Sequence, residues 1–239
     1  MKNSPTKASF FVSLGHTFPK LKTENEAGIM SWVSQNTTIP IPEVLAFDSS
    51  TPNPIGHEYI LLSGASGDTL SEIYHLLNDD EIAGILDQLI DILSQLHAIE
   101  WSAIGGLRLR NAGSIEVGPV IEETFWQTPD IECYWPGETI ETLNIRGPYF
   151  SYVEYISAHV RKYMYAISRH KKLEVMQDTL NSLETFLKAL ELSAEELNKV
   201  RFKLAHRDLH FGNILFDRDS GKITAILDWE FSGIVPFTR

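Results

Sequence analysis

Cysteine and long apolar runs are nearly absent from the sequence, and each absence excludes a class of protein. Cys133 is the only cysteine among the 239 residues, so neither an intrachain disulfide nor a cysteine-based zinc site can form. No apolar run approaches the roughly 18 residues of a membrane span. Two lysines precede an apolar patch near the N-terminus, but that patch is too short for a signal sequence. We therefore expect a cytoplasmic protein with no membrane partner.

Positive charge is also scarce. The chain has 20 basic and 32 acidic residues, which gives a formal net charge of −12. Such an excess repels phosphate backbones and argues against nucleic acid as the main partner, whereas a cationic small-molecule substrate is compatible with it. Hydrophobic residues make up 43% of the chain and charged residues 22%, which is ordinary for a globular protein with a sizeable core. The sequence contains no repeats and no low-complexity segment.

The first part of the chain reads as β-rich with one helix. Aromatic and β-branched residues predict strands over residues 9–14, 44–47 and 58–62. Between the first two strands, Thr23 and Glu26 have the spacing of a capping box and predict the start of a helix. Small, flexible residues then follow the third strand and mark a boundary.

The second part reads as mainly helical. Asn78 is expected to cap a long helix, whose apolar residues recur with the 3.6-residue period of one face. These residues are Ile82, Ile85, Leu86, Leu89, Leu93 and Leu96. The remaining expected elements are an irregular hairpin over 105–120, a long loop over 125–150, helices over 152–167 and 173–190, and a short helix capped by Ser193.

Two motifs near the C-terminal end have the residue types needed for catalysis. Residues 205–213 read AHRDLHFGN, and residues 226–230 read ILDWE. The segment between them predicts a hairpin with strands over 214–217 and 222–227 and a turn over 218–221. This hairpin returns the second motif to the first.

Three side chains of these motifs suit phosphoryl transfer. The Asp208 carboxylate could accept a hydroxyl proton, and Asn213 and Asp228 could hold Mg²⁺ through hard oxygen ligands. The protein-kinase catalytic loop has the same histidine-arginine-aspartate run and the same distance to its asparagine. Each residue also has a structural alternative: a turn for Asp208 and Asn213, and a strand-end cap for Asp228. Glu230 could be a further acidic ligand or a structural ion-pair partner.

The histidines of the first motif raise a different hypothesis. On an extended chain His206, Asp208 and His210 would face one way and could bind a transition metal, as in a metallohydrolase. No histidine follows His210 to complete such a site. A role for His206 in bracing the loop is therefore favoured.

On these motifs the chain resembles the aminoglycoside phosphotransferase and choline-kinase-like branch of the protein-kinase-like fold, and its fungal members in particular. Residues 18–26, 41–48 and 58–62 support the resemblance, with the sequences FPKLKTENE, IPEVLAFD and EYILL. The similarity is collinear from about Phe10 to Pro236.

The resemblance implies an α+β, two-lobed protein-kinase-like fold. Residues 1–63 would form a reduced β-rich N-lobe, and residues 64–239 a mainly helical C-lobe with the catalytic loop and the metal-binding hairpin. ATP would bind between the lobes, with its adenine against the hinge. The expected hinge residues are Leu62, Ser63, Gly64 and Ala65.

The resemblance also implies a function: an ATP- and Mg²⁺-dependent kinase that acts on a hydroxyl of a small molecule. Asp208 would be the catalytic base, and Asn213 and Asp228 the metal ligands. Glu26 would be the helix partner of a strand lysine, unless its role is confined to the capping box.

The chain departs from the family pattern at its phosphate-binding end. No glycine-rich loop precedes the first strand, and none of residues 10–13, where the strand lysine is expected, is basic. Lys7 lies too early for that role, and Lys20 and Lys22 lie too close to the helix. The chain also ends nine residues after Glu230. The alternative hypothesis is therefore a catalytically impaired kinase-like protein or a truncated gene product.

Overall fold

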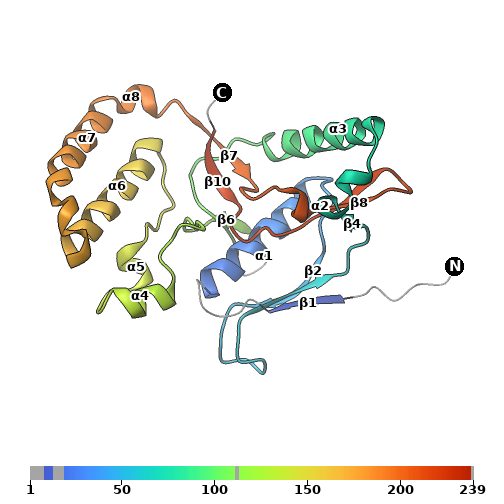
Figure 1. The fold of residues 1–239 in the computed structure, drawn as a ribbon, viewed down its shortest axis with the longest axis horizontal. Helices are drawn as coiled ribbons and strands as arrows, with labels where there is room; N and C mark the ends of the chain where they lie inside the picture. Colours follow the sequence, from blue (N-terminus) through green and yellow to red (C-terminus); the bar gives the residue numbers. More distant parts are fainter. Residues whose placement is uncertain (1–7, 13–18, 111–112, 238–239) are drawn as a thin grey trace.

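The structure, a computed structural model, describes residues 8–12, 19–110 and 113–237 (Figure 1). Its first sheet has three antiparallel strands in the order β1-β3-β2. These are β1 (Ala8–Val12), β2 (Val44–Asp48) and β3 (Tyr59–Ser63). The three predicted strands are thereby confirmed, except that residues 13 and 14 lie outside the described residues.

Helix α1 (Pro19–Asn36) begins four residues before the predicted capping box. Proline suits the first turn of a helix because its φ is already helical and its missing N–H has no intrahelical partner there. Thr23 is therefore an interior helical residue, buried to 3% exposure. The predicted capping box of Thr23 and Glu26 is wrong, and Glu26 is left without a capping role.

Helix α3 (Asp79–Leu96) has the predicted cap. The Asn78 side chain accepts a hydrogen bond from the Glu81 backbone N–H at 2.9 Å, and the Glu81 carboxylate accepts one from Asn78 at 2.8 Å. The buried face is made by Ile85, Ile92 and Leu96, whereas the predicted face members Leu86 and Leu93 are 54% and 40% exposed. The predicted helix and its apolar period are confirmed, but the most buried line of the helix lies to one side of the apolar stripe, so part of the stripe faces solvent.

The middle of the chain forms a hairpin and a group of helices at one end of the molecule (Figure 1). The predicted hairpin is confirmed as β5 (Leu107–Leu109) paired with β6 (Ile115–Val117). The prediction of a loop over 125–150 is wrong in part, since this segment contains α4 (Thr128–Tyr134) and α5 (Ile140–Leu143). Helices of seven and four residues are too short to show a clear apolar period.

The longer helices of this group follow the predicted order. Helix α6 (Tyr152–Arg169) is confirmed. The single helix predicted over 173–190 is instead a 3-10 segment, η2 (Lys171–Thr179), followed by α7 (Leu180–Leu192). Helix α8 (Ala194–Leu197) is present, but Ser193 makes no side-chain capping hydrogen bond. In the described part of the chain no helix is long and apolar enough to cross a bilayer.

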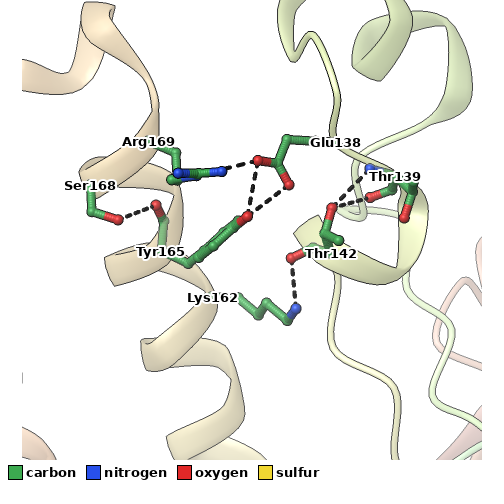
Figure 2. A network of polar contacts seen from close by, with 7 residues as sticks. All are labelled: Glu138, Thr139, Thr142, Lys162, Tyr165, Ser168 and Arg169. Carbon is green, nitrogen blue, oxygen red and sulfur yellow. Dashed lines mark hydrogen bonds and ion pairs between the residues drawn. The ribbon is translucent and has the colours of Figure 1, made fainter.

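A polar network joins the connection between α4 and α5 to one face of α6 (Figure 2). The Tyr165 hydroxyl donates to the Glu138 carboxylate at 2.8 and 2.9 Å, and Arg169 approaches the same carboxylate at 3.4 Å. Lys162 donates to the backbone carbonyl of Thr142 at 2.6 Å. These contacts hold the short helices against α6.

The C-terminal part contains the predicted hairpin. Strand β8 (Ile214–Asp217) pairs antiparallel with β9 (Lys222–Ile226), and β4 (Asp68–Thr69) extends that sheet beyond β8. Two short elements follow β4 in the sequence, α2 (Leu70–Ile73) and the 3-10 segment η1 (Tyr74–Leu76). The remaining C-terminal elements are the 3-10 segment η3 (Phe211–Asn213) and the antiparallel pair of β7 (Arg201–Ala205) and β10 (Gly233–Phe237).

A single hydrophobic cluster connects these parts. It includes Ile60 of β3, Met30 of α1, Leu204 of β7, Ile214 of β8 and Trp229, all at most 4% exposed. The first sheet, α1 and the two C-terminal motifs therefore share one core, and the predicted boundary between residues 63 and 64 stays a prediction.

Two helical glycines test how tightly α1 packs on β5. A side chain at Gly28 would collide with the backbone carbonyl of Leu107, whereas one at Gly84 in α3 would meet open space. Gly84→Ala should raise the free energy of unfolding by about 1 kcal/mol, because alanine favours the helix. Gly28→Ala should lower it by roughly 1–3 kcal/mol through overpacking. Urea denaturation of both variants measures this difference, and equal stabilisation would contradict the close approach of α1 and Leu107.

Candidate active site

His206 braces the loop that follows β7, as predicted. Its side chain is 3% exposed and its ring packs against Trp229 with centroids 4.5 Å apart. The Nε2 atom lies 2.8 Å from the Leu227 carbonyl oxygen, and the Asp208 backbone N–H donates to Nδ1 at 3.3 Å. A carbonyl can only accept and a backbone N–H can only donate, so the ring is neutral, with its proton on Nε2 and Nδ1 as the acceptor.

Asp208 and Asn213 are brought into direct contact. The Asn213 side-chain amide donates to the backbone carbonyl of Asp208 at 2.9 Å and to its carboxylate at 3.4 Å. Both bonds use Nδ2, which leaves the amide oxygen Oδ1 as the acceptor end of the group. Asn213 is buried, whereas the Asp208 side chain is 51% exposed. A carboxylate open to solvent thus lies beside an oriented amide.

Asp228 lies beside this pair at the end of the hairpin. The Leu227 backbone N–H donates to the Asn213 carbonyl at 2.8 Å, which fixes the end of β9 on η3. Asp228 has a φ of 62°, in the left-handed region that aspartate tolerates better than most residues. Burial raises the pKa of Asp228, and the charges of Glu230 and Asp208 raise it further. The carboxylates of Asp228 and Asp208 therefore share one electrostatic environment.

These residues suit a hard cation. A carboxylate and an amide oxygen are the ligand types that Mg²⁺ prefers, and the ion normally keeps several waters besides. Burial raises the pKa of Asp228 first, acidic neighbours raise it further, and Lys22 opposes the rise, so a cation bound beside Asp228 would favour the ionised carboxylate. Asn213 and Asp228 therefore have the chemistry to hold such an ion.

The predicted transition-metal set of His206, Asp208 and His210 does not form. Both ring nitrogens of His206 are engaged by backbone groups, and the Gly212 N–H donates to Nδ1 of His210 at 2.9 Å. The chain turns at this point, with His210 N–H bonded to the Asp208 carbonyl; Nε2 of His210 lies 3.7 Å from the Asp208 carboxylate, but His206 is held by its own backbone partners. Among the described residues no three histidine, cysteine or acidic side chains are grouped to hold a metal ion.

Glu26 lies among acidic groups. Burial raises its pKa to about 7, the charges of Glu230 and Asp228 add to the rise, and Lys22 opposes it. Lys22 pairs with Glu230 at 2.7 Å. The sequence prediction had dismissed Lys22 because of its closeness to the helix, yet it lies inside α1. The signal that could have found it is its spacing of one helical turn from Glu26.

A second polar group was missed because its members come from separate stretches. Arg207, with a φ of 70°, donates to the Ile121 carbonyl at 2.8 Å and approaches the Glu122 carboxylate at 3.7 Å. The same buried carboxylate accepts the Tyr155 hydroxyl at 2.5 Å and lies 3.6 Å from Nε2 of His159. The loop that contains Asp208 is therefore tied to α6.

The predicted hinge lies at the end of β3. Leu62 and Ser63 are its last two residues, and Gly64 and Ala65 follow it. The Ser63 hydroxyl accepts the Glu43 backbone N–H at 2.9 Å. Contact between these residues and an adenine stays a prediction.

Comparison with known proteins identifies the family. A model of the phosphotransferase enzyme family matches residues 3–238. The chain belongs to this family. The predicted resemblance to aminoglycoside phosphotransferases is thereby confirmed, together with the α+β, kinase-like fold.

Similar proteins are found among fungi. A subtelomeric hrmA-associated cluster protein of Aspergillus fumigatus is 24% identical over 257 residues, which cover 90% of this chain and 50% of the relative. A clavilactone A biosynthesis cluster protein of Ampulloclitocybe clavipes is 26% identical, with the same coverage of both chains. The chain thus spans about half the length of the curated relatives it matches.

Among solved structures, the gentamicin-APH(2")-IIa complex is similar over 99% of this chain and 65% of that chain. Its TM-score is 0.53 at 13% sequence identity. A ternary complex of the aminoglycoside phosphotransferase APH(4)-Ia with ADP and hygromycin B has a TM-score of 0.45 and 20% identity, over 98% of this chain and 66% of that chain.

The tautomer of His206 makes the stability of the loop sensitive to acid. Burial lowers the pKa of His206 below its ordinary value, so the unfolded chain takes up a proton at a higher pH than the folded chain does. The free energy of unfolding should therefore fall as the pH drops from about 7 towards 5.

The variant His206→Gln should be less stable near neutral pH but should lose this part of the acid dependence. His75→Gln, at an exposed histidine in η1, is the control and should keep the wild-type slope. Urea denaturation across this pH range measures both, and an unchanged slope in His206→Gln would contradict the assignment.

Proposed function

We propose that the protein is an ATP- and Mg²⁺-dependent phosphotransferase that acts on a hydroxyl group of a small molecule. The observation that carries this proposal is the contact of Asn213 with Asp208, with Asp228 in the same electrostatic environment. Membership of the phosphotransferase enzyme family supports the reaction class. A structural neighbour binds gentamicin, which supports a small-molecule acceptor.

The residues have distinct roles in this proposal. Asp208, exposed to solvent, orients the acceptor hydroxyl and receives its proton. Asn213 and Asp228 hold Mg²⁺. The hinge residues Leu62, Ser63, Gly64 and Ala65 face the adenine. When bound, the metal and the nucleotide supply the phosphoryl group and the positive charge that its transfer needs.

Most of the catalytic effect would come from positioning, because phosphoryl transfer needs little covalent chemistry from the protein. The Asn213 amide ties the loop that contains Asp208 to η3, and the neutral His206 ring ties the same loop to Leu227. Proton transfer to a positioned base contributes typically 10²–10⁴-fold. The cytoplasmic location expected from the sequence stays a prediction.

The proposal predicts which variants of the site change kcat and which change the affinity for Mg-nucleotide. Asp208→Asn should lower kcat by about 10²–10⁴-fold and leave the Kd for Mg-ADP nearly unchanged, because the proton acceptor is lost without a metal ligand. Asn213→Ala should instead weaken Mg-dependent nucleotide binding. Asp217→Asn, at an aspartate of β8, is the matched control. ADP release with a panel of amino-sugars and amino-alcohols gives the rates, and calorimetry gives the affinities.

Equal turnover by the wild type and Asp208→Asn would exclude Asp208 as the base. A second outcome would favour the binding-only alternative: Mg-ATP stabilises the protein, but no acceptor is phosphorylated. Nucleotide at 100-fold excess over its Kd should stabilise the fold by about 2.7 kcal/mol, so a thermal shift detects binding without turnover.

A further inference from the structure

Helix α1 is fastened to the ILDWE segment by two side chains on one face. The Lys22 ammonium pairs with Oε2 of Glu230 at 2.7 Å, and the two side chains are only 12% and 29% exposed. One turn along the helix, the Asn25 amide donates to the backbone carbonyls of Glu230 at 3.1 Å and Ser232 at 2.9 Å. Lys22 is thus held at a fixed place relative to Asp228.

Further contacts make this attachment rigid. Asn25 is 2% exposed, and its Oδ1 accepts the backbone N–H of Leu107 at 2.9 Å. The Ser232 hydroxyl donates to the backbone carbonyl of His206 at 2.9 Å. A continuous path of hydrogen bonds therefore runs from α1 to the loop that contains Asp208.

The charge around this attachment is unbalanced. Hydrogen bonds of Asn213 join Asp208 to the segment that contains Asp228 and Glu230, so three carboxylates lie in this part of the fold. Lys22 is the cation paired with one of them, Glu230. Bringing the phosphates of a nucleotide to such a site is unfavourable unless a cation meets them.

The first strand does not supply that cation. Strand β1 has the sequence ASFFV, with no basic residue. Arg207, the basic residue next to Asp208, turns its guanidinium to Ile121 and Glu122. Among the described residues, Lys22 is an ammonium held 2.7 Å from Glu230, two residues along the chain from Asp228.

We propose that Lys22, from helix α1, is the cation that meets the nucleotide phosphates beside Asn213 and Asp228, and that Glu230 holds it ready for them. This inference rests on the proposed function, because it assumes that a nucleotide binds there. Lys22 exchanges a carboxylate for a phosphate partner when the nucleotide binds, so its charge stays paired in both states.

Two roles for Lys22 predict opposite changes in the affinity for a bare divalent cation when the lysine is replaced by methionine. If Lys22 meets the phosphates, Lys22→Met makes the site more negative. A bare divalent cation then binds more tightly, while Mg-nucleotide binds more weakly. If the ion pair is only a structural attachment, its loss loosens the site and weakens both.

The experiment compares Lys22→Met and Lys22→Arg with Lys20→Met, which removes an exposed lysine from the same helix. Binding of Mn²⁺ alone is followed by electron paramagnetic resonance, and binding of Mg-ADP by calorimetry. We expect Lys22→Met to weaken Mg-ADP at least tenfold, the loss expected for a charge-assisted hydrogen bond, and to tighten Mn²⁺ several-fold. Lys22→Arg should restore most of the nucleotide affinity, and Lys20→Met should match the wild type.

Unchanged Mg-ADP affinity in Lys22→Met, or weaker binding of both ligands, would overturn the inference and leave the proposed function standing. Absence of Mg-ADP binding by the wild type would overturn both. Thermal unfolding without ligand confirms that each variant is folded.

Discussion

The packing of His206 on Trp229 is the constraint on which the candidate site depends. Trp229 is fully buried and its Nε1 donates to the Ile226 carbonyl, while His206 holds the Leu227 carbonyl. These two rings fix the start of one motif against the end of the other. Asp228 lies between the two anchored positions, so its left-handed backbone is imposed by its neighbours. The site is thus built on core packing, and only its carboxylates reach outward.

The electrostatics of the site follow from this construction. Core packing holds the two motifs together, and partial burial, together with the negative charges of Glu230 and Asp208, raises the pKa of Asp228. Carboxylates that repel one another do not stabilise the fold. A group of this kind suits a ligand with positive charge, which agrees with the metal-dependent reaction proposed above.

Local features of the site and fold could be predicted from the sequence, and distant contacts could not. The β8–β9 hairpin and the Asn78 cap are specified by neighbouring residues, and the contact of Asp208 with Asn213 arises within one loop. The Lys22–Glu230 pair joins residues 208 positions apart, and no local pattern marks such a pair. The short helices α4 and α5 were missed for a different reason, since brief elements show too little periodicity. The start of α1 was misplaced because Thr23 and Glu26 have the spacing of a capping box inside the helix.

Gly28 has a consequence for how the molecule can move. The backbone of α1 touches the carbonyl of Leu107 at a place where even a methyl group does not fit. A helix seated this closely cannot roll about its axis without separating from β5, and the buried Asn25 bonds would break with it. The close approach at Gly28 and the bonds of Asn25 therefore hold α1 in one position against the segment that contains Asp228.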